Sequence, residues 1–297
     1  MSDLRVNNIT NLKGDSAPII AGVCTVSSNY SMVIPSGPTG SRHKSCEGIL
    51  TDDLKFHMDG RDSYSGDDNI NMVYDLSSNG SVGTKTGTVV HTVETSGNEY
   101  YNFNGSSYIE FPNPGAYGPS FTAGCWLRFD DIHPDSTQAP FAHGETQTSE
   151  DKVPFIIRTS NGASLQFWYE AQNDADYNIS TRGTTGGPSN STVGITSAVL
   201  DNNIWYNVNI TFDYKTMKQS IMLGTTSYDN LYSNYKVRPQ PPSNINNPIT
   251  VGCRNNSGYA YVNFFKGDIS VAYIYDRVLS AEEFTKNHNV YKGRHGY

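Results

Sequence analysis

Hydrophobic and polar residues alternate in many short stretches of this chain, and residues that favour turns separate the stretches. Candidate strands of this kind lie at residues 88–93, 100–103, 107–111, 121–129, 155–158, 165–170, 205–212, 219–223 and 249–253. Long helical patterns are missing from the sequence. Many short strands with turns between them predict an all-β sandwich of two sheets rather than alternating strands and helices.

The most strongly patterned stretch runs from Phe264 to Phe284. Its first half has the two-residue period of a half-buried strand. The apolar face predicted for this strand is formed by Ile269, Val271, Tyr273 and Tyr275. The intervening residues, such as Ser270 and Ala272, are predicted to lie mostly on the other face.

A short C-terminal helix is predicted to follow this strand. Ser280 is a suitable N-cap, and Glu283 stands three residues later, where its side chain can bond back to the cap. Leu279 and Phe284 occupy the positions of a hydrophobic staple. These signals agree on a helix that begins at Ser280.

Residues 1–46 differ from the rest of the chain. They are polar, they carry only short apolar groups, and they end in the turn-rich sequence PSGPTG at residues 35–40. Such a segment cannot bury a core of its own. It is either an extended N-terminal arm that orders on a partner or a disordered leader. The predicted organisation is therefore this segment at 1–46 and a globular domain at 47–297.

Charge excludes one class of partner. The 297 residues contain 21 Lys and Arg against 29 Asp and Glu, a net charge of −8, and the basic residues are not clustered. Binding to nucleic acid depends on clustered Lys and Arg that neutralise phosphates. We therefore expect no nucleic-acid partner. Only 17% of residues are charged, so Ser, Thr, Asn and Tyr must form much of the surface, which suits contact with sugars.

The distribution of apolar residues and cysteines argues against a membrane protein, an exported protein and a zinc or disulfide site. No run of about 18 apolar residues is present and the N-terminus lacks an apolar signal region, so we expect neither membrane insertion nor export by a signal peptide. The cysteines are widely spaced without a CxxC pair, which predicts free thiols rather than a zinc site or a disulfide framework. They are Cys24, Cys46, Cys125 and Cys253.

Several motifs, taken in order, resemble the laminin-G/concanavalin A-like jelly-roll family. They are LKFHMDG at 54–60, YDLSSNG at 74–80, YYNFNGSSYIEF at 100–111, FTAGCWLRF at 121–129, WYNVNITFD at 205–213 and GDISVAYIYDRVLSAEEF at 267–284. The resemblance implies a two-sheet antiparallel jelly-roll sandwich, here with an extended N-terminal arm and a short C-terminal helix.

The N-terminal sequence VNNITNLKGDSAPIIAGVCTVSSNYSMVIPSGPTG resembles the leader of virion structural proteins from tailed phages of marine cyanobacteria. This resemblance implies a capsid decoration or tail-fibre component, assembled in the host cytoplasm and located in the virion. Its partners would be other virion proteins and host surface glycans, and homo-oligomerisation stays open. The alternative is a lectin-type adhesin at a fibre tip. The apolar arm residues expected to dock on the particle are Val6, Ile9, Ile19, Ile20, Val23, Met32 and Ile34.

Jelly rolls of this family include glycoside hydrolases, which use two nearby carboxylates. The pattern Glu-x-Asp-x-x-Glu in a strand is not found in this sequence. Glu110 stands alone between Ile109 and Phe111, and the adjacent Asp130 and Asp131 point apart at a strand end. We therefore expect no enzyme.

A sugar-binding strand is suggested at residues 165–170. Gln166, Trp168 and Glu170 share one face, and a tryptophan beside amide and carboxylate groups can stack on a pyranose. The alternative, which the pattern favours, is that Trp168 packs inside the sandwich and the opposite face is exposed.

Two long polar stretches, residues 171–198 and 224–248, are predicted as loops for binding, partner contact or decoration. The first contains Asp174, Asp176 and Asn178, which have the spacing that opens a calcium-binding EF-hand loop. Ile179 and Thr185 then stand where that loop needs glycine and glutamate. We therefore expect no cofactor and no metal, with this triplet as a weak calcium candidate.

Overall fold

The computed structural model describes residues 48–61, 71–115, 118, 120–131, 137–146, 152–160, 164–168, 192–195, 200–216, 218–231, 247–256 and 260–297. The chain divides into two compact units, residues 1–43 and 44–297, and all described residues belong to the second. The predicted arm at 1–46 and its boundary therefore stay predictions. The docking residues outside the described part are Val6, Ile9, Ile19, Ile20, Val23, Met32 and Ile34.

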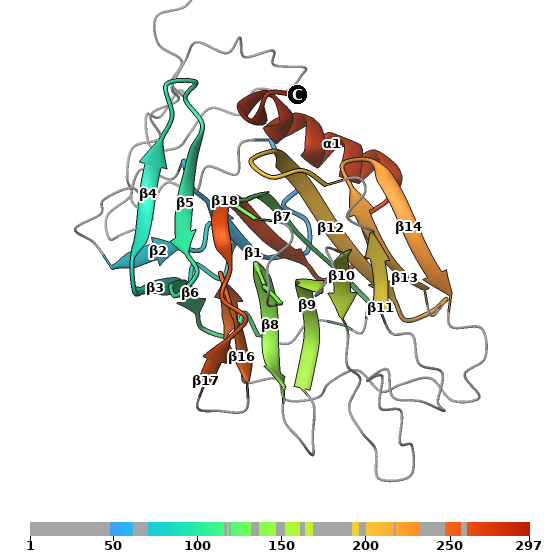
Figure 1. Cartoon of the computed structure of the whole chain (residues 1–297). Helices are drawn as coiled ribbons and strands as arrows, with labels where there is room; N and C mark the ends of the chain where they lie inside the picture. The colour runs from blue at the N-terminus through green and yellow to red at the C-terminus, as the bar shows by residue number, and fades with distance from the viewer. Residues whose placement is uncertain are drawn as a thin grey trace, which may run out of the picture. The chain divides into compact units, whose positions relative to one another are not determined.

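The described residues form two large β-sheets (Figure 1). Sheet A has the order β14 (Thr226–Leu231), β13 (Lys218–Leu223), β12 (Trp205–Asp213), β7 (Phe121–Phe129), β18 (Lys266–Tyr275), β5 (Glu99–Asn104) and β4 (Val89–Val93), with β1 (Leu54–Asp59) paired to β18. Its pairings are all antiparallel.

Sheet B lies against sheet A. Its order is β11 (Thr192–Ile195), β10 (Ser164–Trp168), β9 (Lys152–Ser160), β8 (Phe141–Thr146), β15 (Ile249–Val251), β6 (Tyr108–Phe111), β3 (Val82–Thr86) and β2 (Met72–Tyr74). The hairpin of β16 (Arg254–Asn256) and β17 (Ala260–Val262) joins through a short parallel pairing of β16 with β8.

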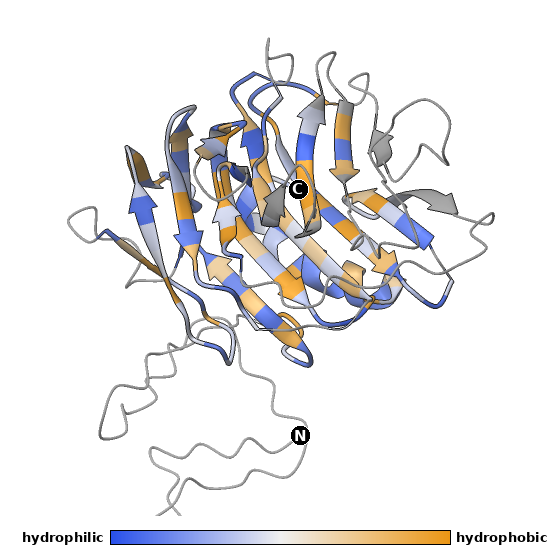
Figure 2. Cartoon of the chain, turned by 90° about the horizontal axis from the view of Figure 1, so that it is seen from below, coloured by the Kyte–Doolittle hydropathy of each residue, from blue (hydrophilic) through white to orange (hydrophobic). Residues whose placement is uncertain are grey.

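The main hydrophobic core fills the space between the two sheets. Phe121 of sheet A illustrates it, because its ring stacks on Phe155 at 5.8 Å and meets the edge of Phe167 at 6.2 Å, both in sheet B. Hydrophobic and polar residues alternate along many strands (Figure 2), as expected when one face of each sheet is buried. The predicted two-sheet antiparallel jelly-roll sandwich is confirmed.

The prediction for β18 was wrong in two respects, because both faces of the strand are buried and Ile269 does not share a face with Val271 and Tyr273. The strand is central in sheet A, since β7 pairs along one edge while β5 and β1 share the other. A register shift between Ile269 and Val271 also moves these residues to different sides. Ile269 packs between the sheets, whereas Val271 and Tyr273 pack on the outer face of sheet A. Both faces of the strand are buried.

The C-terminal helix covers that outer face. Helix α1 (Ala281–Lys292) begins after Ser280, and the predicted capping box with Glu283 is present. Leu279 and Phe284 both belong to the cluster beneath it. A short 3-10 helix, η2 (Gly293–His295), follows α1. No helix among the described residues is long and apolar enough to span a membrane.

A second hydrophobic cluster, on the outer face of sheet A, contains two of the tryptophans. Trp126 and Trp205 are buried, and they lie on the outer side of sheet A rather than between the sheets. Trp126 is stacked against His288 of α1 at 5.2 Å. The helix therefore makes a third layer on the sandwich.

Parts of the two predicted loops are strands. β11 lies within residues 171–198, and β14 lies within residues 224–248. Each extends an edge of its sheet by backbone pairing, β11 with β10 and β14 with β13. Polar residues at a sheet edge need no hydrophobic period, because pairing rather than burial holds the strand in place.

Candidate functional site

The outer face of sheet B carries the candidate site. In β6, Ile109 and Phe111 are fully buried in the core between the sheets, while Tyr108 and Glu110 are half-buried. Successive strand residues point to opposite faces. Tyr108 and Glu110 therefore face away from the core.

Two aromatic residues from distant sequence complete this site. The ring of Tyr261 in β17 stacks on Tyr108, with centroids 4.2 Å apart and planes at 24°. The ring of Phe264, which follows β17, lies 6.2 Å from Tyr108. The Tyr261 hydroxyl donates a hydrogen bond to Oε2 of Glu110. We call Tyr108, Glu110, Tyr261 and Phe264 the aromatic platform, and all four side chains are half-buried.

Burial and the neighbouring carboxylate control the charge of the platform. Burial raises the pKa of Tyr261, and the hydrogen bond to Glu110 and its negative charge raise it further. The phenol therefore keeps its proton at neutral pH and acts as a donor to Glu110. Burial likewise raises the pKa of the nearby Cys253, so this free cysteine is a thiol and not a reactive thiolate.

No second carboxylate stands directly beside Glu110 on the neighbouring described strands. Its cross-strand partners are Thr84 in β3 and Thr250 in β15. Thr84 is exposed, whereas Thr250 is buried and donates to the carbonyl of Cys253 at 2.8 Å. Retaining glycoside hydrolysis needs two carboxyl groups roughly 5 Å apart. These positions supply only one, together with hydroxyl groups.

The predicted sugar-binding strand is only partly visible. Leu165 and Phe167 are fully buried and Gln166 is half-buried, so the predicted alternation is confirmed for these three residues. Gln166 accepts a hydrogen bond from Nε of Arg158 at 3.1 Å. Trp168 ends β10, but its side chain and the whole of Glu170 lie outside the described residues.

Strand register shows how far this strand lies from the platform. Glu110 pairs with Thr250, Thr250 with Ala142, Ala142 with Ile156, and Ile156 with Trp168. Four strand spacings separate Glu110 from Trp168 in this row, or roughly 19 Å. The three positions between them are buried. The platform and the β10 position are therefore separate, and no open groove joins them along this row.

The metal candidates are not placed by the structure. Asp174, Asp176 and Asn178 lie outside the described residues. Within the described ranges, no three His, Cys, Asp or Glu side chains gather in a way that would hold a metal ion. The weak calcium candidate therefore stays a sequence prediction.

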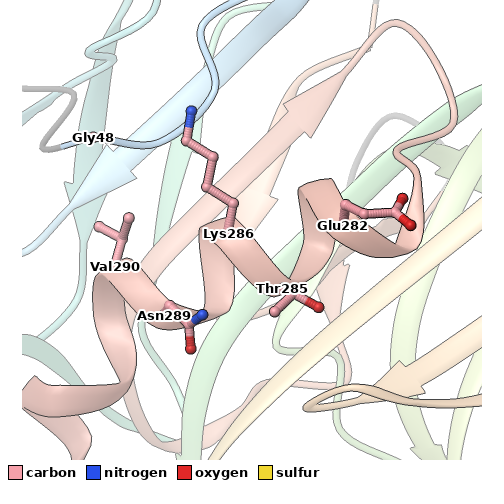
Figure 3. Close-up of a pocket in the computed structure, with 6 residues that line it drawn as sticks. All are labelled: Gly48, Glu282, Thr285, Lys286, Asn289 and Val290. Carbon is pink, nitrogen blue, oxygen red and sulfur yellow. The ribbon is translucent and has the colours of Figure 1, made fainter. Parts of the chain in front are cut away.

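A groove with a volume of about 530 Å³ runs along the solvent side of α1 (Figure 3). Val290 and Lys286 point toward Gly48, while Thr285 and Asn289 point the other way. Glu282 also lines the groove. The groove therefore has one acidic and one basic residue, Glu282 and Lys286, and most of its side chains are exposed. It contains no convergent set of polar groups like that of the platform.

Local sequence patterns predict only half of the platform. The pattern of residues 107–111 already places Tyr108 and Glu110 on one face. The sequence shows no second carboxylate near Glu110, and so it gives no sign of a catalytic pair there. Its partner Tyr261 is 151 residues away, and no local pattern connects the two.

Solved structures with the same fold support the architecture. The receptor binding domain of botulinum neurotoxin C/D mosaic serotype has a TM-score of 0.52 and 11% identity, over 81% of this chain and 52% of that one. The binding domain of botulinum neurotoxin DC in complex with SialylT has a TM-score of 0.53 and 12% identity, over 80% of this chain and 52% of that one. A mutant of Trypanosoma rangeli sialidase displaying trans-sialidase activity has a TM-score of 0.52 and 12% identity, over 83% of this chain and 34% of that one. The chain spans about half the length of the neurotoxin domains, and these identities show the fold alone.

Sequence comparison identifies the family. A search among curated proteins finds no match. The family profile described as the Concanavalin A-like lectin/glucanases superfamily matches residues 103–284, which is more than half of the chain. This region contains both sheets' central strands and the whole aromatic platform. The chain belongs to the Concanavalin A-like lectin/glucanases superfamily.

Proposed function

We propose that this chain is a non-enzymatic, glycan-binding structural protein of a phage virion. The observation that carries the binding role is the aromatic platform. It combines three half-buried aromatic rings with a carboxylate on the outer face of a rigid sheet. Neighbours of the same fold are named for receptor binding and for a complex with SialylT, which supports a carbohydrate ligand.

The chemistry of the platform fits a pyranose ring. The apolar C–H face of a sugar can pack on the exposed side of an aromatic ring, and its hydroxyl groups can donate to a carboxylate. Glu110 has one oxygen bonded to Tyr261, which holds the carboxylate in place beside the rings. A site already ordered in this way loses less entropy when ligand binds.

The non-enzymatic part rests on the carboxylates. Sequence lacks the paired motif of the family's hydrolases, and threonines occupy the cross-strand positions beside Glu110. Release of reducing sugar from cyanobacterial envelope polysaccharide would contradict this part of the proposal. A lectin-type adhesin at a fibre tip would use the same platform, with sugar binding as the main task of the protein.

Tyr261→Ala is expected to weaken glycan binding at least tenfold, because it removes both a stacking ring and the donor that orients Glu110. The measurement is binding of the full chain to a glycan array, followed by titration of the strongest ligand. Tyr261→Phe keeps the ring and serves as the matched control for packing, with a smaller loss expected.

Trp168→Ala distinguishes the platform from the strand predicted by sequence. If the platform binds the glycan, Trp168→Ala keeps wild-type affinity. Loss of binding in Trp168→Ala with full binding in Tyr261→Ala would instead place the sugar at β10. If wild-type protein binds no glycan, the lectin part of the proposal is wrong and a purely decorative role is left.

The virion role rests on the N-terminal sequence and its resemblance to phage leaders. In this proposal the apolar residues of 1–46 dock on capsid or tail proteins, and the jelly roll is displayed outward. Deleting residues 2–40 is expected to leave a folded domain that no longer joins particles, because that domain has its own core. The measurement is incorporation into particles assembled in infected cells, and incorporation of the truncated protein would contradict the docking role.

A further inference from the structure

We infer that Glu110 makes the aromatic platform select uncharged glycans over acidic ones. This inference rests on the proposed glycan binding and names the chemical class that the site accepts.

The polar atoms of the platform mainly accept hydrogen bonds. Tyr261 uses its proton on Glu110, so its oxygen offers lone pairs to a ligand. The second oxygen of the Glu110 carboxylate is an acceptor without a proton of its own. A ligand that supplies hydroxyl donors matches these groups, whereas a ligand carboxylate or sulfate supplies only further acceptors.

The charged group acting on Tyr261 is the Glu110 carboxylate, which accepts the hydrogen bond of the phenol and raises its pKa. A ligand anion beside Tyr261 would be repelled by the same carboxylate. The charge of Glu110 therefore works against acidic sugars at the place where the ring stacks.

Basic residues on the adjoining strands are directed elsewhere. Lys85 in β3 is buried and its ammonium lies over the Tyr101 ring at 5.5 Å, on the core side of the sheet. Arg254 in β16 pairs with Val262, one position away from Tyr261, so strand alternation turns it to the opposite face. Lys266 belongs to sheet A, where it pairs with Asn104. Lys85 and Arg254 are therefore not placed to neutralise a ligand anion on the face of the platform.

The test uses pairs of oligosaccharides that differ only at carbon 6. Oligosaccharides ending in glucose, galactose or mannose are each compared with the same chain ending in the corresponding uronic acid. We expect wild-type protein to bind the neutral member about tenfold more tightly, the difference that one screened like-charge contact produces. Glu110→Gln keeps an acceptor for Tyr261 and removes the charge, so its affinity ratio is expected to fall to about one.

Ionic strength gives a second readout that needs no variant. Raising salt screens exposed charges, so the ratio for wild-type protein is expected to shrink, while that of Glu110→Gln stays constant. An unchanged ratio in Glu110→Gln, or a wild-type ratio insensitive to salt, overturns the role of Glu110 and leaves glycan binding intact. Failure of all the oligosaccharides to bind overturns the proposed binding function and this inference with it.

Discussion

Asp59→Ala is expected to lower the free energy of unfolding by about 3–5 kcal/mol, because it removes one member of a buried ion pair. Nη1 of Arg294 lies 2.8 Å and 3.0 Å from the two carboxylate oxygens of Asp59. The side chains are only 3% and 8% exposed. The variant keeps Arg294 buried but removes the negative charge beside it.

This pair holds the C-terminus on sheet A. Asp59 ends β1, and Arg294 belongs to η2, after α1. The guanidinium also lies over the Tyr291 ring at 5.0 Å, and Tyr291 in turn bonds His57 at 2.9 Å. Loss of Asp59 is therefore expected to loosen the helix as well as the pair itself.

Urea unfolding measures the effect. If the slope of the unfolding free energy against urea concentration is unchanged, the folded state is intact. The double variant Asp59→Ala/Arg294→Met removes both charges and is expected to recover part of the loss. Lys55→Ala breaks the half-exposed pair with Asp276 and is expected to cost about 1 kcal/mol or less. A similar cost for Asp59→Ala would show that the buried pair has no special role.

Lowering the pH from 7 to 5 is expected to cost about 4 kcal/mol of stability, because two buried histidines must stay neutral in the folded protein. Burial lowers the pKa of His143 from 6.5 to about 3, and burial also lowers that of His295 to about 3. His143 contacts the carbonyl of Asn247 at 3.1 Å, and His295 lies 2.7 Å from the Ser270 hydroxyl.

The direction follows from proton binding. Below pH 6.5 the unfolded chain protonates each histidine and the folded protein does not, so stability is complete above pH 6.5 and falls toward pH 3. Each histidine contributes a slope of about 1.4 kcal/mol per pH unit. The raised pKa of Asp268 acts in the opposite direction, as that carboxylate takes up its proton.

Unfolding free energies at pH 7, 6 and 5 test this dependence. His295→Gln removes one of these titrating groups and is expected to reduce the slope by about 1.4 kcal/mol per pH unit. Equal stability at pH 7 and pH 5 would contradict protonation of buried histidines as the cause. The slope is read above pH 5 because carboxylates ordinarily titrate below that range.

Much of the fold follows from local patterns. β7 was predicted with its observed ends, and β12 differs by one residue at its end, because their apolar residues are flanked by clear turns. The start of α1 was also predicted correctly, since a capping box joins residues only three positions apart. Strands such as β11 and β14 were missed because sheet pairing holds them without a hydrophobic period.

The candidate site was less accessible to prediction. Alternation in β6 shows that Tyr108 and Glu110 share a face, but nothing near them in the chain identifies Tyr261 as their partner. The sequence drew attention to Gln166, Trp168 and Glu170 instead, because a tryptophan in an alternating strand is a strong local signal. That position lies across the sheet from the platform.

The sequence by itself determined the all-β class, most central strands and the capped helix. Each depends on residues close together in the chain or on composition alone. Only the tertiary structure decided that both faces of β18 are buried and that Glu110 meets Tyr261. The reason is that these features arise from packing between distant segments, which a local hydrophobic period cannot predict. They are the bulge in β18, the helix that covers sheet A and the contact between Glu110 and Tyr261 across 151 residues.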